Sequence, residues 1–343
     1  ASNNTAIGAT ALNANTTGSA NVAIGKDALK ANTTAANNTA VGYQSQEATT
    51  TGASNTSVGL HALRLNTTGT RNVALGVQAL DANTVGDKNI ALGMDALGAN
   101  VDGSRSVAVG DSALAAQDPA SAVDMYNTAV GHGAGAAVTT GVLNTFIGGL
   151  AGDSTTTANN VTAVGAGALG ANTTGADITA VGTATLATNT TGASNTAVGY
   201  GALNANTTAA NNTGIGAFAL VANTTGASNV AVGKGALDAN TTGASNCGIG
   251  LDAGGGITTG SHNIGIGNGT FVDSVVLTTG GNNIIIGNFS RTDAADSSYV
   301  IGLGYNIDAA SGYTTLGRDA ADIRASHGNV TWATVSDQRY KKD

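Results

Sequence analysis

The chain has 343 residues, of which 10% are charged and 3% aromatic, and its net charge is −8. This balance argues against a nucleic-acid partner, which needs a basic surface, and no apolar run approaches the roughly 20 residues that insert across a membrane. A content of 51 glycines with the single proline Pro119 excludes a collagen helix, which needs glycine at every third position and abundant proline.

A short motif recurs along most of the chain and ends at a glycine, as in Asn195–Gly199, Asn-Thr-Ala-Val-Gly. We call this residue the repeat glycine. Repeat glycines stand 17 residues apart from Gly8 to Gly110 and, after one step of 21, continue at intervals of 17 as far as Gly267. A fixed short period is typical of a solenoid, in which each unit buries its apolar side chains by stacking on its neighbours. We therefore predict an all-β fold, a parallel β-roll or β-solenoid shaft of 17-residue coils over residues 1–267.

Each unit is expected to hold two short strands. The first ends at the repeat glycine, and after a turn comes a second extended run such as Gly201–Leu203, followed by a polar return. The second run supplies a column of leucines, at most one per coil, for the core. The asparagine that opens each unit forms another column, either an amide ladder between coils or a set of turn residues, and we favour turn residues.

The first strand has two apolar faces. In Thr196–Val198 the threonine and valine point to one face and the alanine to the other, because successive side chains of a strand alternate. A lone roll covers only one of these faces. We expect the small middle residue on the outer face, where it permits close approach around a symmetry axis, and hence a homotrimeric rod with chains intertwined or side by side. We choose three chains over two, and the 17-residue period alone does not distinguish a trimer from a dimer.

The repeat is similar to that of a known family. The unit at Asn195–Gly199 resembles the Asn-Ser-Val-Ala-Ile-Gly repeats of trimeric autotransporter adhesin heads, over roughly residues 1–267. The resemblance implies a parallel β-roll that trimerises. The 17-residue unit is longer than the usual repeat of those heads, so the cross-section of the roll differs.

The period is interrupted once inside the shaft. Four extra residues after Gly110 fall within Gln117–Tyr126. Insertions in solenoids map to surface loops that often bind ligands, so Asp118, Asp124 and Tyr126 are candidate ligand-binding residues; a tolerated bulge is the alternative. The two aspartates are also the pair to test for a glycan-cleaving enzyme, because glycosidases need paired carboxylates.

Beyond Gly267 the period changes, and residues 268–331 are expected to form an irregular β region that closes the rod. Aromatic residues gather from here to the end of the chain, together with six of the 13 basic residues, from Arg291 to Lys342. They predict either a glycan site, since rings stack on sugars, or a wider core, and we favour the wider core.

Residues 332–343 include the run Ser336-Asp-Gln-Arg-Tyr-Lys341. The run resembles the start of the intramolecular chaperone autoprocessing domain found at the C-termini of phage tail fibres, tailspikes and neck appendages. The resemblance implies self-cleavage between Ser336 and Asp337, with Ser336 and Lys341 as the catalytic pair, and serine with lysine is a known combination of nucleophile and base. Because Ala1 falls within a unit, we also expect the natural protein to extend further at its N-terminus.

Together, the repeat and the motif predict a homotrimeric phage tail fibre or appendage. Such a fibre is an extracellular part of the virion that joins other virion tail proteins and attaches to a host-surface glycan or protein receptor. A trimeric adhesin on the bacterial cell surface is the alternative, and a glycan-cleaving tailspike or an ice-binding solenoid is less favoured. Apart from self-cleavage we expect no enzyme activity, and we expect no cofactor and no metal, because the four histidines lack ligand spacing.

Overall fold

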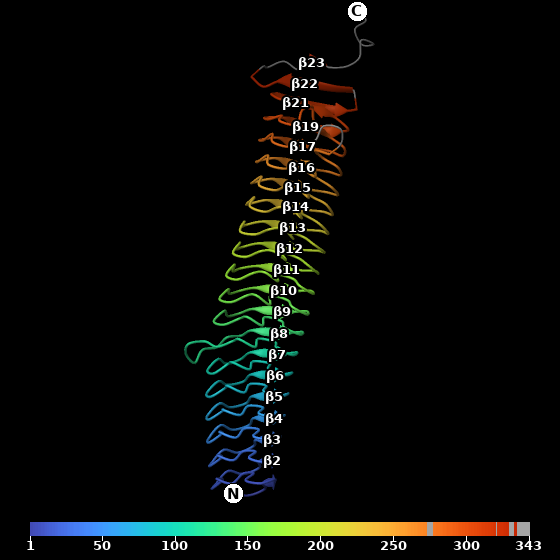
Figure 1. Ribbon diagram of the computed structural model, residues 1–343. Coiled ribbons are helices and arrows are strands. Elements are labelled where there is room, and N and C mark those ends of the chain that lie inside the picture. Colours follow the sequence, from blue (N-terminus) through green and yellow to red (C-terminus); the bar gives the residue numbers. More distant parts are fainter. Residues whose placement is uncertain (273–276, 320, 329–332, 335–343) are drawn as a thin grey trace, which may run out of the picture. The chain divides into compact units, whose positions relative to one another are not determined.

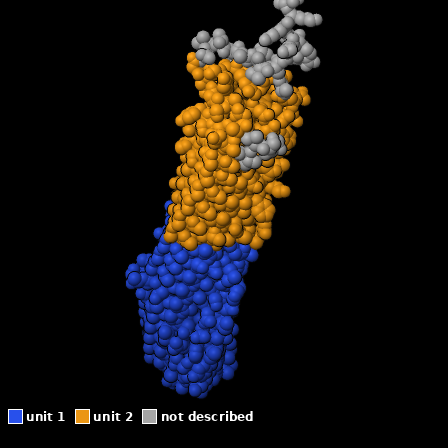
Figure 2. All heavy atoms as spheres, turned by 45° about the horizontal axis from the view of Figure 1, so that its top comes forward, with its two compact units in different colours: residues 1–177 blue, residues 178–343 orange. Residues whose placement is uncertain are grey.

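In this computed structural model, the structure describes residues 1–272, 277–319, 321–328 and 333–334. No residue within these ranges is helical, and the regular elements are short β-strands, most of them stacked in parallel. The predicted all-β parallel solenoid with coils of about 17 residues is therefore confirmed. The chain divides into two compact units, unit 1 (residues 1–177) and unit 2 (residues 178–343), which are coloured separately in Figure 2.

Unit 1 consists of coils that each contribute one strand of three residues, stacked in chain order (Figure 1). Neighbouring strands pair in parallel, and paired residues lie 17 positions apart except between β7 and β8, where Val107 pairs with Thr128 across the insertion. The strands are β1 (Thr5–Ile7), β2 (Val22–Ile24), β3 (Thr39–Val41), β4 (Thr56–Val58), β5 (Val73–Leu75), β6 (Ile90–Leu92), β7 (Val107–Val109), β8 (Thr128–Val130), β9 (Thr145–Ile147) and β10 (Thr162–Val164).

Unit 2 has the same kind of coil at first and then a different ending. Strands β11 to β17, β19 and β21 pair in parallel in that order, whereas β21, β22 and β23 pair antiparallel, and β18 forms a separate parallel pair with β20. The strands are β11 (Thr179–Val181), β12 (Thr196–Val198), β13 (Thr213–Ile215), β14 (Val230–Val232), β15 (Cys247–Ile249), β16 (Ile264–Ile266), β17 (Ile284–Ile286), β18 (Arg291–Thr292), β19 (Ile301–Tyr305), β20 (Asp308–Ala309), β21 (Tyr313–Arg318), β22 (Ala321–Ser326) and β23 (Ala333–Thr334).

The middle residue of each strand from β2 to β17 is buried inside its coil, and its two neighbours point outward. Ala197 of β12 is fully buried, while Thr196 and Val198 on either side of it are half-buried. The alternation is confirmed, but the expectation that the small residue faces outward is wrong. The reason is visible at Gly214, the middle residue of β13, where an added Cβ would lie 3.4 Å from Cδ1 of Leu203. Leucines of the preceding coil fill the interior, so only a small residue fits opposite them.

The leucine column lies in a turn, so the prediction of a second strand is wrong. Leu29 and Leu203 have φ angles of 48° and 52°, in the left-handed region, and the surrounding residues are turns. Both side chains are fully buried. The backbone N–H of Leu203 donates to the carbonyl of Ala219 in the next coil at 2.9 Å. Burial and this hydrogen bond offset the backbone strain of a left-handed leucine, which costs roughly 1–2 kcal/mol.

The repeat glycine is required by both its conformation and its surroundings. Gly42 has a φ of 137°, and a Cβ added to it would lie 2.3 Å from the carbonyl oxygen of Gly59, the repeat glycine of the next coil. No side chain fits such a close approach of two backbones. The period of glycines in the sequence therefore reports the places where successive coils touch.

Two columns of buried asparagines connect the coils. Before most of the three-residue strands stands an asparagine such as Asn72, which accepts a hydrogen bond from the N–H of Asn89 (2.9 Å) and donates to the carbonyl of Gly86 (2.8 Å). In the polar return, Asn83 donates to the same carbonyl (3.1 Å) and to Oδ1 of Asn66 in the preceding coil (3.0 Å). These asparagines are fully buried. The first column is thus an amide ladder, so the favoured interpretation as turn residues is wrong, and the sequence analysis missed the second column.

One coil of unit 1 shows how tightly the interior volume is shared. Phe146, in the middle of β9, is fully buried where most strands have alanine. The leucine position is glycine at Gly135 and at Gly152, and a Cβ added there would lie 2.7 Å and 2.2 Å from the phenylalanine ring. The ring therefore occupies the volume that leucines of two coils fill elsewhere.

This sharing predicts a non-additive pair of substitutions. Phe146→Ala should open a cavity and lower the free energy of unfolding by about 3–5 kcal/mol. Gly152→Leu alone should also destabilise the protein, because the leucine would collide with the ring, but it should recover part of the loss when combined with Phe146→Ala. Denaturant titration of the three variants beside the wild type checks this. Strictly additive effects would show that the two sites do not share one volume.

Candidate interaction surfaces

The outward side chains of the strands form an aliphatic surface on each unit. We define the strand face as the first and third residues of β1 to β17; all of them are Thr, Val, Ile, Leu or Cys, and none is charged. Many of these side chains are more than a third exposed, with exposed fractions from 37% to 59%. They are Ile7, Val58, Leu75, Ile90, Val130 and Ile147 in unit 1 and Ile215, Val230, Ile249 and Ile286 in unit 2.

Charged side chains in the coils lie at the turns instead. Arg64 pairs with Asp81 at 2.9 Å, and Lys30 pairs with Glu47 at 3.5 Å, in each case between residues 17 positions apart. These ion pairs connect equivalent positions of successive coils. The strand face itself is uncharged, and the turn beyond the repeat glycine adds exposed apolar side chains such as Leu60, Met94 and Leu251. A continuous apolar strip of this kind on a protein surface marks an interaction site.

The insertion is fastened to the coils at both of its ends. Pro119 and Met125 are buried, and both side chains lie close to Gly103 in the preceding coil. Gln117 takes the place of a ladder asparagine: its Nε2 donates to Oδ1 of Asn100 at 3.0 Å, and its Oε1 accepts from Nδ2 of Asn127 at 2.9 Å. The inserted segment thus begins next to one buried amide, that of Gln117, and ends next to another, that of Asn127.

Two of the three candidate residues of the insertion come together around an arginine. Arg105 donates to Asp124 and, at 2.7 Å, to the hydroxyl of Tyr126, and its guanidinium lies 5.5 Å from the centre of the tyrosine ring. Asp118 is exposed, and its backbone N–H donates to the carbonyl of Thr139. The carboxylate of Asp124 is thus engaged by a cation from the preceding coil, which favours a fastening role for it over that of a catalytic acid or base. Arg105 lies outside the insertion and was missed from the sequence.

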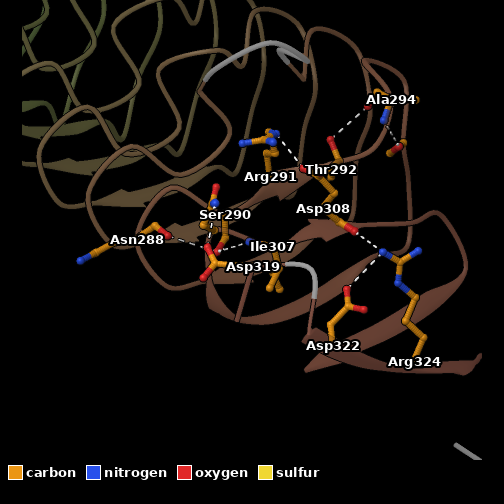
Figure 3. A network of polar contacts seen from close by, with 12 residues as sticks. Asn288, Ser290, Arg291, Thr292, Ala294, Ile307, Asp308, Asp319, Asp322 and Arg324 are labelled. Atoms are coloured by element: carbon orange, nitrogen blue, oxygen red, sulfur yellow. Dashed lines mark hydrogen bonds and ion pairs between the residues drawn. The ribbon is translucent and has the colours of Figure 1, made fainter. Parts of the chain in front are cut away.

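Near the end of unit 2, a network of polar contacts holds the last coils together (Figure 3). Arg291 of β18 pairs with Asp308 of β20 at 2.7 Å. Arg324 of β22 donates to the carbonyl of Asp308 at 2.8 Å and to Asp322 at 3.2 Å. Asp322 is buried, so its contact with Arg324 compensates for the loss of water around the carboxylate. Two of the basic residues that gather in this region therefore serve its internal structure.

The aromatic residues of the same region lie mostly on the surface. Among those that the structure describes, Phe271 is buried, whereas the exposed fractions are 39% for Phe289, 66% for Tyr299, 44% for Tyr305 and 39% for Tyr313. The favoured interpretation of these residues as a wider core is wrong for these four. The middle residues of β16 and β19 are glycines, Gly265 and Gly302, whereas the middle residue of β17 between them is the buried Ile285.

The self-cleavage motif lies outside the described residues. Ser336, Asp337 and Lys341 belong to 335–343, so their predicted roles stay predictions. Within the described ranges, no group of three or more histidine, cysteine or acidic side chains could hold a metal ion. A search of the same ranges finds no helix that could span a membrane.

Comparison with known proteins returned no match to a family model, to a curated protein or to a solved structure.

A close pair of carboxylates stands out among the charged groups of unit 2. Asp238 and Asp252 belong to successive coils, and both approach Gly235: a Cβ added there would lie 2.2 Å from Oδ1 of Asp252 and 3.9 Å from Oδ2 of Asp238. Partial burial and, secondly, the charge of Asp252 raise the pKa of Asp238 above its usual value. Ionisation of Asp238 therefore lowers the stability of the folded coil.

The sign of this shift predicts the effect of removing the charge. A group whose pKa is raised by folding stabilises the protein only while protonated, and this contribution is lost as the pH rises through the folded-state pKa. Asp238→Asn should therefore raise the denaturation midpoint at pH 7 and leave it nearly unchanged at pH 3, below the ordinary aspartate pKa of about 3.9. Asn204 occupies the equivalent coil position, so the amide is compatible with the turn. A gain that persists undiminished at pH 3 would contradict the electrostatic cause.

Proposed function

We propose that this chain is the shaft of a homotrimeric phage tail fibre or appendage, located on the virion, that attaches to a receptor on the host surface. The observation that supports the assembly is the strand face, uncharged and aliphatic in every coil from β1 to β17. A single solenoid leaves this face in water. Two further copies around a threefold axis would cover it while the ion pairs at the turns, such as that of Arg64 with Asp81, remain outside.

The repetition of the coil suits such an assembly. The outward residues of every coil are of the same types and stand at the same positions in the coil. When parallel copies align in register, the aliphatic columns of one copy therefore pack against those of its neighbours. Burying the exposed part of one such side chain contributes on the order of 1 kcal/mol. Association costs about 4–15 kcal/mol, so a single coil is insufficient and the repeated columns are what make the assembly stable. Cyclic symmetry keeps all chains parallel and closes the interface.

Two resemblances support the biological assignment. The repeat resembles adhesin heads that trimerise, and the run from Ser336 to Lys341 resembles the domain that folds and trims phage fibres. A bacterial trimeric adhesin is the second candidate, supported by the repeat alone. The gene decides between them: a chaperone domain after residue 343 supports the fibre, and a membrane-anchor barrel supports the adhesin. Self-cleavage at Ser336–Asp337 belongs to the fibre proposal and is tested by the mass of the mature chain.

Light scattering coupled to size-exclusion chromatography tests the assembly. The wild-type chain of 33.0 kDa should elute with three times this mass. Ile215→Asp places a charge on the strand face. It should raise the protein concentration at which half of the trimer dissociates at least tenfold, because three carboxylates would be buried at one level. Val221→Asp is the matched control, since it lies in the next turn at the coil position where Asp238 occurs naturally, and should leave the mass unchanged. A wild-type monomer would overturn the proposal.

A further inference from the structure

An exposed pair of aromatic rings lies at one corner of the last coils of unit 2. Phe289 and Tyr305 belong to successive coils, and their ring centres are 6.1 Å apart with the planes at 89°. Phe289 lies in the turn two residues beyond the repeat glycine Gly287, and Tyr305, the last residue of β19, directly follows Gly304. Tyr200 and Phe218 occupy the same corner of earlier coils, with ring centres 5.2 Å apart at 88°. The edge-to-face arrangement thus occurs twice at this corner, whereas the rings of Tyr43 and His61, also at this corner, are tilted at 41°.

Polar groups surround the pair formed by Phe289 and Tyr305. The guanidinium of Arg318 lies 5.6 Å from the centre of the Tyr305 ring, and its Nε lies 3.4 Å from Oδ2 of Asp319. Asn306 donates from Nδ2 to Oδ1 of Asp319 at 2.9 Å. The side chains of Arg318 and Asp319 are 78% and 52% exposed, so most of their hydrogen-bonding capacity faces solvent. The charges of the arginine and the aspartate balance each other.

Backbone contacts hold this cluster in place. The N–H of Asp319 donates to the carbonyl of Tyr305 at 2.9 Å, and Tyr305 pairs with Arg318 in the parallel ladder of β19 and β21. Tyr305 and Arg318 are thus carried by adjacent strands of one ladder, with Phe289 in the turn after β17 and Asp319 directly after β21. An apolar platform with a few convergent polar groups on a rigid scaffold is the usual composition of a small-ligand site.

We infer that this corner binds a neutral pyranose ring of a saccharide. A pyranose has an apolar face of C–H groups and a rim of hydroxyl groups. The C–H face suits the exposed rings of Phe289 and Tyr305, while the hydroxyls suit the donors of Arg318 and Asn306 and the acceptor oxygens of Asp319. The balanced charge of Arg318 and Asp319 favours a neutral sugar over a uronic or sialic acid. The inference rests on the proposed attachment role, for which it names the class of receptor.

Saturation-transfer NMR on the full chain tests this assignment. The probes are methyl β-glucopyranoside, methyl β-galactopyranoside, methyl α-mannopyranoside, methyl β-N-acetylglucosaminide and, as the acidic comparison, methyl β-glucuronide. The wild type should transfer saturation to the ring C–H protons of at least one neutral probe. Tyr305→Leu, which keeps apolar volume but removes the ring, should reduce this transfer at least fivefold.

Tyr299→Ala is the matched control, because Tyr299 is an exposed tyrosine of the same unit at 66% exposure. It should leave the transfer unchanged. Transfer to none of the neutral probes, preference for the glucuronide, or full transfer by Tyr305→Leu would each overturn the assignment. The oligomeric state is measured on the same samples. A trimer without transfer overturns only the saccharide site, whereas a monomer with ring-dependent transfer overturns the fibre and retains the site.

Discussion

The narrow interior of the coil is the constraint on which the rest of the structure depends. A turn leucine such as Leu203 fills the space in front of the next strand, so the middle residue of that strand is alanine or glycine. Where the strand carries a large residue, as at Phe146, the leucine position becomes glycine. Because the interior accepts so little volume, the larger residues of each strand point outward. The aliphatic strand face is thus a direct consequence of how the coil is filled.

Hydrogen bonds between coils explain how such a thin core is sufficient. Each coil buries only a few aliphatic groups, but many of its backbone N–H groups donate to carbonyls of a neighbouring coil. Buried asparagines such as Asn72 and Asn83 extend this pairing into the side chains, and their amides satisfy carbonyls that the turns leave open. A buried amide without its partners costs about 1–3 kcal/mol, so the ladder also specifies the register of the stack.

The sequence predicted the repeat, the parallel stacking and the alternation along the strand, because all three follow from the period of 17 and from backbone geometry. It did not predict which face of Thr196–Val198 is inside, since alanine and valine suit a core equally well until the volume of the leucine is known. Nor did it predict the left-handed leucines, because isolated leucines rarely adopt that conformation. In the candidate surfaces, Asp124 and Tyr126 were found, but Arg105 was missed because its contact with them exists only after the coils stack.

The surface consists of a part that repeats from coil to coil and parts that break the repeat. The coils repeat an uncharged face that suits partner copies, and the residues that break the pattern, at the insertion and near Tyr305, carry the polar and aromatic groups suited to recognition. In the proposed fibre, assembly and attachment therefore use different parts of one chain. Neither depends on a deep pocket, because rings and guanidinium groups at the corners of coils already project from a rigid scaffold.

Distances between spin labels test the in-register packing of strand faces most directly. With the sole cysteine replaced, Cys247→Ser, a label is attached at Ser54→Cys in one sample and at Ser228→Cys in another; both residues are exposed and occupy the same coil position. Parallel copies in register keep equivalent coils level, so both samples should give the same short interchain distance. Different distances at the two positions, or no interchain distance at either, would contradict the account.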